Sequence, residues 1–320
     1  MFSNQRAELH LPLAQAAMDR DYLSRARPEL FDELWADPQT RVMAMYDGKV
    51  LLHQQDAHPT AELKLLPVEQ VPSAKLRVYL GKSTVASNYE DAGTPIVLAV
   101  LSKNAADNLE PEPNSWHHLR KAGSGLGARD AGLFTQALAL SNWHESHQYC
   151  SRCGTPTVIE QGGWVRRCFN DDLETYPRTD PAVIVAIVDD EDRILLGSQG
   201  VWEDNRWSIL AGFVEPGESL DAAVEREMYE EAGLRVTQIT YLGSQAWPFP
   251  HSLMFGFAAR AIGQQLEVAD GIEIEKLRWF SRQELEAEAP QLLLPGRISI
   301  ARAIIEEWFG KQITSKTELS

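Results

Sequence analysis

The chain has 320 residues, of which 44% are hydrophobic, so it is long enough to bury the cores of two domains and a small insert. Its net charge of −16 disfavours loose, charge-driven binding to nucleic acid or to acidic membranes. The sequence contains neither a long apolar run nor the apolar core of a signal peptide near its start. Three cysteines are too few for a disulfide framework and suit a reducing compartment. We therefore expect a cytoplasmic protein with no membrane partner.

The N-terminal part, residues 1–142, alternates short apolar runs with turn signals such as Asp47-Gly48. Two runs predict strands and a third segment has helical periodicity: VMAMY, PIVLAVL and AGLFTQALALSNW. This pattern predicts an α+β domain with no evident catalytic motif and no sequence repeat. The paired His117 and His118 could bind a metal ion, although structural, partly exposed histidines are the better interpretation.

A short cysteine-containing segment follows at the centre of the chain. Cys150 and Cys153 form a C-x2-C pair, and Cys168 follows after fourteen intervening residues. The pattern is typical of a zinc ribbon, but such ribbons normally carry C-x2-C twice, and here Asp171 stands in the last position. Because a carboxylate can bind zinc, these four residues are a candidate ligand set. His147 is a competing donor, and a metal-free ribbon held by packing is the open alternative.

The C-terminal part alternates buried strands with two helical segments. Six segments predict strands: AVIVAIV, ILLGSQ, WSILAGFV, TYLGSQAW, LMFGFAARA and LRWFS. A helix is expected between the third and fourth of these, and SIARAIIEEWF predicts a C-terminal helix. We place the domain boundaries at 1–142, 143–176 for the ribbon-like insert, and 177–310 for the catalytic domain. The polar segment 311–320 is expected to be disordered.

An acidic cluster in the C-terminal part carries the chemistry. Glu227, Glu230 and Glu231 stand at i, i+3 and i+4, so on a helix they share one face. Ser219 can cap that helix, and Arg226 can hold a carboxylate in a fixed orientation. Three like charges so close repel one another, and a divalent metal ion is the simplest counter-charge, because hard cations prefer carboxylate oxygens. By themselves, such residues are also compatible with a solvated acidic helix.

The longer pattern around the cluster decides between these interpretations. Residues 212–234, GFVEPGESLDAAVEREMYEEAGL, resemble the complete Nudix box, G-x5-E-x7-R-E-U-x-E-E-x-G-U. The resemblance implies hydrolysis of a nucleoside diphosphate linked to another group, with Mg²⁺ or Mn²⁺ as cofactor. It also implies that Glu227 and Glu231 bind metal together with the backbone carbonyl of Ala211. Glu230 would be a further ligand or a base.

A second motif narrows the substrate. Residues 244–252, SQAWPFPHS, resemble the SQPWPFPxS signature of NADH pyrophosphatases, with Ala246 in place of a proline. Two prolines stiffen this loop, which can hold Trp247 and Phe249 for packing on flat rings. The resemblance implies cleavage of NAD(H) into nicotinamide mononucleotide and AMP, by a homodimer, with a variable N-terminal domain and a ribbon ahead of the catalytic domain. The whole chain is then expected to be α+β, ending in a Nudix α/β/α sandwich.

The resemblance also assigns residues to the site. Glu273 is the candidate further metal ligand, although it also fits a solvated acidic pattern. The implied substrate contacts are Tyr176, Phe213, Gln245, Ala246, Trp247, Pro248, Phe249, Pro250, His251, Ser252, Ala301 and Arg120.

Three other functions are compatible with the sequence. Removal of an NAD cap from RNA 5′ ends uses the same bond and the same residues. Hydrolysis of another dinucleotide such as ADP-ribose needs only the box. A nucleotide sensor without turnover is a non-enzymatic alternative, against which the intact glutamates argue.

Overall fold

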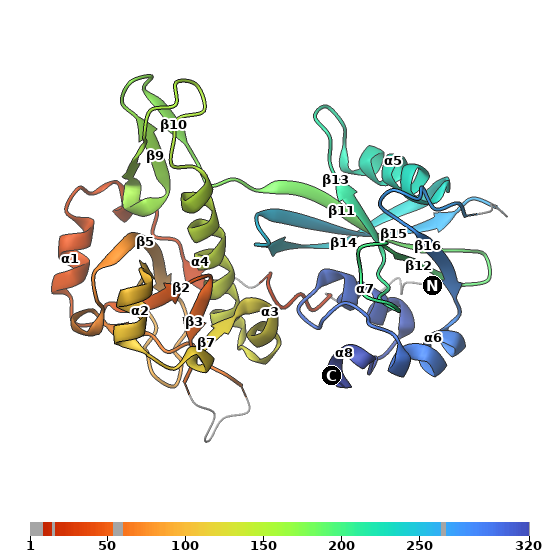
Figure 1. Ribbon diagram of the computed structural model, residues 1–320, viewed down its shortest axis with the longest axis horizontal. Helices are drawn as coiled ribbons and strands as arrows, with labels where there is room; N and C mark the ends of the chain where they lie inside the picture. The colour runs from red at the N-terminus through yellow and green to blue at the C-terminus, as the bar shows by residue number, and fades with distance from the viewer. Residues whose placement is uncertain (1–8, 15–16, 54–59, 264–266, 320) are drawn as a thin grey trace. The chain divides into compact units, whose positions relative to one another are not determined.

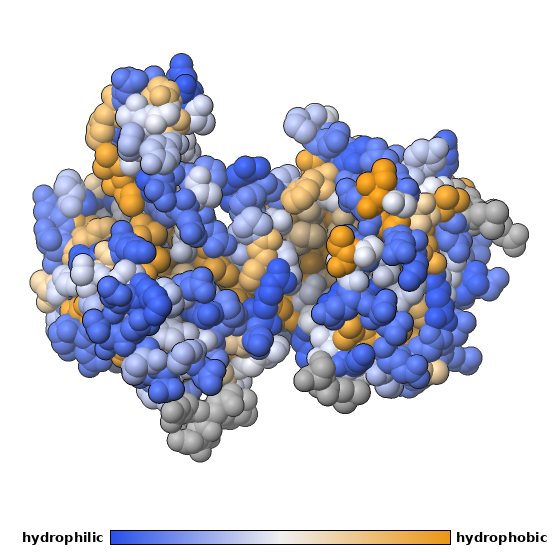
Figure 2. Space-filling view, in the orientation of Figure 1, coloured by the Kyte–Doolittle hydropathy of each residue, from blue (hydrophilic) through white to orange (hydrophobic). Residues whose placement is uncertain are grey.

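The computed structural model describes residues 9–14, 17–53, 60–263 and 267–319. Contacts divide the chain into two compact units. The N-terminal unit comprises residues 12–179 with 247–251, and the C-terminal unit comprises 180–246 and 252–319 with 9–11. Hydrophilic side chains dominate the visible surface in Figure 2, in keeping with the net charge of −16. Within the described ranges, no helix is long and apolar enough to cross a membrane.

The N-terminal unit is built on a seven-stranded sheet (Figure 1). Its strand order is β1-β5-β6-β2-β3-β7, with β4 paired to β2. The bounds are β1 Met18–Asp19, β2 Arg41–Tyr46, β3 Lys49–Leu51, β4 Leu66–Pro67, β5 Ala74–Ser83, β6 Pro95–Leu101 and β7 Trp116–His118. The two predicted strands are β2 and β6. Asp47 and Gly48 both take positive φ, which forms the tight turn between β2 and β3.

Four helices complete this unit: α1 Leu30–Ala36, α2 Lys103–Leu109, α3 Leu119–Ala122 and α4 Ala128–Ser146. Apolar residues of α1 and α2 pack on alternate residues of β2 and β6 in one core. The predicted helix is α4, which buries Leu133, Phe134, Ala137 and Leu140. The expected α+β architecture is confirmed.

A small antiparallel sheet extends from the N-terminal unit. It contains β8 Val158–Glu160, β9 Val165–Cys168 and β10 Leu173–Thr175. These strands form the expected ribbon, with Cys150 and Cys153 ahead of β8 and Cys168 as the last residue of β9. Helix α4 continues to Ser146, three residues beyond the predicted start of the ribbon at residue 143.

The C-terminal unit is a six-stranded sheet between helices, the expected α/β/α sandwich (Figure 1). Its order is β14-β15-β11-β12-β16, with β13 paired to β11. The strands are β11 Asp180–Val188, β12 Ile194–Ser198, β13 Leu210–Phe213, β14 Val236–Trp247, β15 Ser252–Ala261 and β16 Lys276–Phe280. The helices are α5 Leu220–Ala232, α6 Arg282–Glu288, α7 Ile300–Phe309 and α8 Lys316–Leu319.

Strand β11 explains why its sequence is apolar without alternation. Val183, Val185 and Ile187 pack against α5, whereas Ile184, Ala186 and Val188 pack against α7. Both faces of the strand are therefore covered, and a strand buried on both faces has no polar side. This packing sets α5 on one face of the sheet.

The prediction that 311–320 is disordered is wrong for the described residues 311–319. Ile313 and Ser315 are buried, at 3% and 0% exposure. The Lys316 N–H donates to the Leu292 carbonyl at 3.0 Å, and the Thr317 hydroxyl donates to the Leu294 carbonyl at 2.7 Å. A polar segment is ordered here because its backbone and hydroxyl groups find partners in the domain.

The two units share one pattern of strand pairing, although no sequence repeat connects them. Strand β11 pairs antiparallel with β12 and β13 and parallel with β15. Strand β2 pairs antiparallel with β3 and β4 and parallel with β6. The patterns differ after the third strand, because α5 joins β13 to β14, whereas only the 3-10 turn Val68–Gln70 lies between β4 and β5. The N-terminal unit thus has no counterpart, within that described connection, of the helix that carries the glutamates.

Candidate functional site

Helix α5 carries the acidic cluster and has defined ends. It begins after Ser219, whose hydroxyl accepts a hydrogen bond from the Ala222 N–H at 3.2 Å, as the sequence suggested. It ends at Gly233, which takes the left-handed φ of 68° that glycine accommodates best. The buried apolar face consists of Ala223, Val224, Met228 and Ala232. This face fixes the rotation of the helix and thereby the direction of the glutamates.

Arg226 joins the carboxylates of the box into one network. Its Nε and Nη2 donate to the two oxygens of Glu218 at 3.1 and 2.6 Å, and Nη1 donates to Glu227 and Glu230 at 2.9 Å each. Nη2 also donates to the Phe213 carbonyl at 2.8 Å. The bonds to Glu218 raise the pKa of Arg226 far above its ordinary value and hold the pKa of Glu218 below its own. Arg226 is therefore a permanent cation that orients three carboxylates.

Glu227 and Glu231 are the buried members of the cluster, at 9% and 3% exposure. Burial, and after it the charges of Glu227, Glu273 and Asp270, raises the pKa of Glu231 to about 8. Burial also raises the pKa of Glu227, in spite of its bond to Arg226. Both carboxylates thus lie where an additional positive charge would favour their ionised forms.

Strand β13 brings the backbone close to these carboxylates. Ala211 and Gly212 lie on β13, paired with Ile184 and Val183 of β11. A Cβ atom at Gly212 would lie 1.9–2.2 Å from the carboxylate atoms of Glu227, so only glycine permits this approach. The first glycine of the box is therefore required for space rather than for its backbone conformation.

The donor set at α5 fits a hard divalent cation. Among the described residues, Oε2 of Glu231 is buried without a hydrogen-bond partner, so a carboxylate oxygen is available. Two buried carboxylates with raised pKa values are the ligand type that Mg²⁺ and Mn²⁺ accept. The structure therefore places Glu227 and Glu231 on one helix next to strand β13, which contains Ala211 and Gly212.

Glu273 contributes from outside the helix. It is exposed, in the turn before β16, where its N–H donates to both oxygens of Asp270 at 3.2 Å. Its charge raises the pKa values of Glu227 and Glu231, which puts it within electrostatic range of both. Glu230 differs from them, since its side chain is 56% exposed and is bonded to Arg226.

The predicted substrate loop follows β14, and its residues 247–251 group with the N-terminal unit. The rings of Trp247 and Phe249 meet edge to face, with centroids 4.9 Å apart. The guanidinium carbon of Arg120 lies 3.8 Å from the Phe249 centroid and 5.1 Å from that of Trp247. Arg120, which the resemblance also assigned to the substrate, thus contacts the aromatic loop, and within the described residues no acidic side chain pairs with it.

The remaining predicted contacts divide by exposure. Phe213 and Tyr176 are 57% and 59% exposed, so their rings are available to a ligand. The Gln245 side chain is 1% exposed and donates to the Ile298 carbonyl at 2.9 Å, and Ala301 is buried in the core on α7. The side chains of Gln245 and Ala301 therefore hold the domain together, and only their backbone groups could face a substrate.

The ribbon gathers the predicted zinc donors. One ligand atom each from Cys150, Cys153, Cys168 and Asp171 lies within 4.8 Å of the other three. The Cys150 thiol donates to Asp171 at 3.5 Å, and the sulfurs of Cys153 and Cys168 are also 3.5 Å apart. Three thiols and one carboxylate in this arrangement fit a tetrahedral zinc site. Among the described residues this is the one group of three or more His, Cys, Asp or Glu side chains whose ligand atoms all lie so close together; Glu227, Glu231 and Glu273 do not form a second such group.

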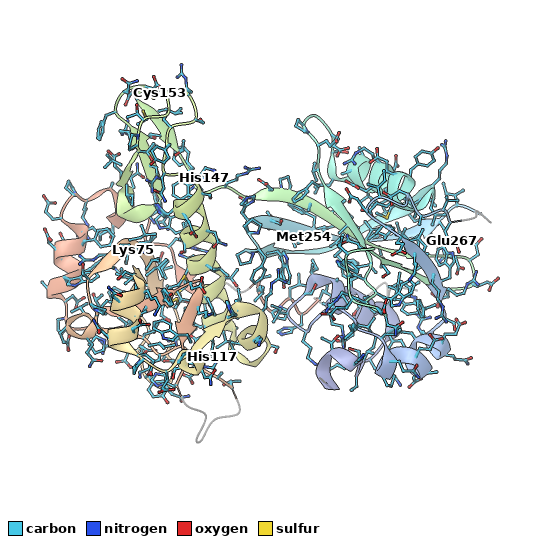
Figure 3. The ribbon with its side chains drawn as sticks, viewed as in Figure 1. Lys75, His117, His147, Cys153, Met254 and Glu267 are labelled. Atoms are coloured by element: carbon cyan, nitrogen blue, oxygen red, sulfur yellow. The ribbon has the colours of Figure 1, made fainter. Side chains whose placement is uncertain are left out.

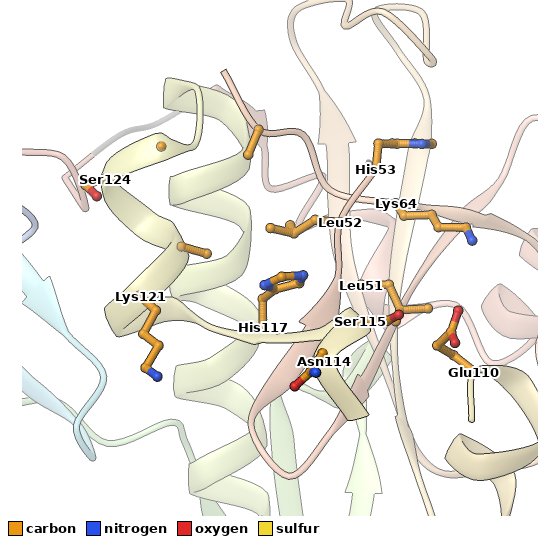
Figure 4. A pocket seen from close by; sticks show the side chains of 13 residues that line it. Leu51, Leu52, His53, Lys64, Glu110, Asn114, Ser115, His117, Lys121 and Ser124 are labelled. Carbon is orange, nitrogen blue, oxygen red and sulfur yellow. The ribbon is translucent and has the colours of Figure 1, made fainter. Parts of the chain in front are cut away.

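The histidines considered from the sequence lie elsewhere. His147 follows α4, where its Nδ1 contacts the Ser146 hydroxyl at 2.9 Å, and Figure 3 shows it apart from Cys153 at the tip of the ribbon. His117 lines a cavity of about 830 Å³ together with Lys64 and Lys121 (Figure 4). Burial and the nearby Lys49 lower the pKa of His118. Cationic neighbours do not suit a metal site, which favours the structural interpretation of both.

Three residues with a part in these sites were not assigned from the sequence. Glu218 belongs to the box, but its bonds to Arg226 depend on the fold of the preceding turn. The close approach at Gly212 is visible only in three dimensions. Asn142, on α4, contacts the aromatic loop 106 residues away, and no sequence signal marks it.

Comparison with known proteins finds three family models that match successive parts of the chain. A model described as NUDIX domain matches residues 178–302, one described as NADH pyrophosphatase zinc ribbon domain matches 145–176, and one described as NADH pyrophosphatase-like rudimentary NUDIX domain matches 39–143. The NAD-capped RNA hydrolase NudC of Mycobacterium tuberculosis is 43% identical over 203 residues, 59% of this chain and 64% of that protein. The NAD-capped RNA hydrolase NUDT12 of Homo sapiens is 36% identical over 197 residues, 57% of this chain and 42% of that protein. The chain thus spans less than two thirds of either relative. A NUDIX hydrolase structure from Nitrosomonas europaea aligns with a TM-score of 0.40 and 25% identity, covering 52% of this chain and 95% of that one.

Proposed function

We propose that the chain, which matches the NUDIX domain model over residues 178–302 and two NADH pyrophosphatase models ahead of it, hydrolyses the pyrophosphate bond of NAD(H) to nicotinamide mononucleotide and AMP. The observation that carries the proposal is Glu231, a carboxylate at 3% exposure with a pKa raised to about 8, beside Glu227 on the box helix. Two buried carboxylates that repel each other are unfavourable in a structural core, whereas a bound cation would stabilise both of them.

The residues that would hold the divalent cation are Glu227, Glu231, the carbonyl of Ala211 and Glu273. Mg²⁺ or Mn²⁺ there would neutralise phosphate oxygens, orient the pyrophosphate and acidify an attacking water. Arg226 keeps the Glu227 and Glu230 carboxylates in place through bonds of 2.9 Å each.

In the reaction, a water oxygen bonds to one phosphorus while the bond from that phosphorus to the bridging oxygen breaks. The bridging oxygen leaves on the other phosphate, and a carboxylate accepts the proton that the water releases. Glu230 suits this base role, because it is exposed and its bond to Arg226 can orient it toward solvent-derived water. Arg226 itself stays charged throughout.

The aromatic loop supports a dinucleotide as the substrate. Trp247 and Phe249 offer ring surfaces for stacking, and Phe213 offers a third. Arg120 is a cation without an acidic partner among the described residues, so it suits a phosphate group. Tyr176 and the backbone of Gln245, Ala246, Pro248, Pro250, His251, Ser252 and Ala301 complete the proposed contacts.

Incubation of the protein with NADH and Mg²⁺ or Mn²⁺ tests the function. We expect equal amounts of reduced nicotinamide mononucleotide and AMP, and no turnover after chelation. Release of other products, or turnover of ADP-ribose with none of NADH, would indicate a different nucleoside diphosphate substrate. Tight nucleotide binding without turnover in either metal would instead indicate a sensor.

NAD-capped RNA is the second candidate substrate, because relatives of M. tuberculosis and H. sapiens are named for that activity. The same bond is cleaved in both substrates, so the catalytic residues would be the same. Rates on NADH and on NAD-capped RNA, measured side by side and compared as kcat/KM, separate them. Lack of activity on the capped RNA would remove this candidate.

We propose one structural zinc ion per chain in the ribbon, held by Cys150, Cys153, Cys168 and Asp171. A thiolate is a softer donor than a carboxylate, so Asp171→Cys is expected to raise zinc affinity, and Asp171→Ala to lower it by at least about tenfold. Competition with a chromophoric chelator measures both. Asp172→Asn is the matched control, because Asp172 pairs with Arg167 rather than with the thiols. Equal affinities for wild type and Asp171→Ala would remove Asp171 from the ligand set.

We also propose a cytoplasmic homodimer. The proposal rests on the family resemblance and on the three thiols, which suit a reducing compartment. Light scattering of the purified chain measures the dimer directly, and a monomer mass at micromolar concentration would count against it.

A further inference from the structure

Asn142 links the aromatic loop to α4. Its Nδ2 group donates to the carbonyls of Pro248 and Pro250, at 3.0 Å each. One amide nitrogen carries two hydrogens, so these two bonds use its full donor capacity. The two acceptors flank Phe249, which is the residue that Arg120 covers at 3.8 Å.

The loop has few backbone bonds of its own. Pro248 and Pro250 have no N–H to donate, and the Phe249 N–H donates to the Trp247 carbonyl at 2.7 Å. Its ends are the last residue of β14 and the first residue of β15. The position of Phe249 between these strands therefore depends on contacts from outside the loop.

Asn142 lies on a long helix that fixes its own position. It lies in the last two turns of the 19-residue helix α4, next to the buried residues Trp143 and His144. Its own carbonyl accepts a bond from the Ser146 hydroxyl at 2.8 Å. A half-buried amide on a rigid helix is suited to fixing a loop, because little conformational entropy is lost when it forms its bonds.

We propose that Asn142 is a positioning residue for the dinucleotide: it holds the loop 247–251 in the shape that receives the substrate rings. The expected effect of Asn142 on substrate binding rests on the proposed function. Asn142 acts through the loop and not on the reacting atoms. Its loss therefore weakens substrate binding and leaves the chemical step unchanged.

Asn142→Asp tests this with a side chain of the same shape. Aspartate has a carboxylate oxygen where asparagine has its NH2 group. This oxygen has no hydrogen to donate and repels the two carbonyl oxygens that it faces, so the loop is expected to move away. We expect KM for NADH to rise about tenfold with kcat within about twofold, from the loss of two hydrogen bonds of ordinary strength. Asn142→Ala should show a smaller rise, because it removes the donors without adding repulsion. Ser141→Ala, one residue earlier on α4, is the matched control and should keep the wild-type KM.

Deuterium exchange of the segment 245–252 gives a readout that does not depend on activity. We expect faster exchange there in Asn142→Asp, with an unchanged melting temperature. Unchanged KM and unchanged exchange in both Asn142 variants would overturn the inference. Equal loss of kcat on NADH and on a pyrophosphate ester without ring groups would also overturn it, because that pattern indicates a general structural effect. If the wild type does not hydrolyse NADH, the proposed function fails, while the exchange result still decides the role of Asn142.

Discussion

Glu231→Gln is expected to lower kcat for NADH hydrolysis by about three orders of magnitude. The variant keeps the size of the side chain and removes the charge that would hold the cation. Loss of several kcal/mol of charge stabilisation in the transition state corresponds to this factor, since each 1.36 kcal/mol is about tenfold. Steady-state kinetics with Mg²⁺ and with Mn²⁺ measures it.

The same substitution is expected to raise the stability of the folded chain, and to raise it more as the pH increases. In the unfolded chain Glu231 titrates near its usual pKa, whereas in the folded chain without metal its pKa is about 8. Between about pH 4.3 and 8 the folded state binds more protons than the unfolded state, so the wild type loses stability as the pH rises through this window. Glutamine carries no charge at any pH. The melting temperature of the chelated variant, relative to the wild type, should therefore increase from pH 5 to pH 8.

Glu225→Gln is the control for both effects, because Glu225 lies on α5 but is exposed. It should change neither kcat nor the pH dependence of stability. Near-normal turnover of Glu231→Gln would remove Glu231 from the cation site. A melting temperature that differs from the wild type by the same amount at every pH would show that Glu231 is already ionised in the folded chain.

Gly212→Ala is expected to lower kcat/KM by about 100-fold or more while the fold is kept. The added Cβ would fall 1.9–2.2 Å from the Glu227 carboxylate, so that carboxylate must move away. Because it is the end of a flexible side chain, the movement costs little stability, but a displacement of about 1 Å in a catalytic group can reduce the rate about 100-fold. Kinetics and thermal unfolding of the same preparation measure the two consequences.

Gly296→Ala is the matched control. A Cβ at Gly296 meets no atom within 4 Å, and its backbone φ needs no glycine, so activity and stability should both stay near wild type. Full activity of Gly212→Ala would show that the position of Glu227 is not critical. Unfolding of Gly212→Ala would show instead that the close approach supports the fold itself.

Much of the candidate site follows from local sequence rules. Ser219 and Gly233 bound α5 because a hydroxyl can cap a helix start and glycine can take positive φ at a helix end. The 3.6-residue period then puts Glu227 and Glu231 on neighbouring turns and Arg226 within reach of Glu230. Each of these relations spans fewer than ten residues, so sequence spacing is sufficient to predict it.

The order of the C-terminal tail could not be predicted in this way. Its residues 311–319 are polar, and composition alone favours disorder. Partners distant in sequence decide the outcome, since Leu292 and Leu294 accept the bonds of Lys316 and Thr317. The shared strand pattern of the two units was hidden for a similar reason, because pairing depends on backbone hydrogen bonds that many different side chains allow.

The sequence by itself determined the candidate donors of this protein: the box, the aromatic loop and the cysteine cluster are short motifs whose spacing specifies them. The tertiary structure decided what the spacing does not contain, namely how far burial shifts the pKa of each donor and which distant residues fix its position. Burial, which depends on the whole fold, separates Glu231 from the exposed Glu230 one residue earlier. Likewise Asn142 and Arg120 meet the loop only because folding brings them together, and no local pattern encodes a contact between residues more than a hundred positions apart.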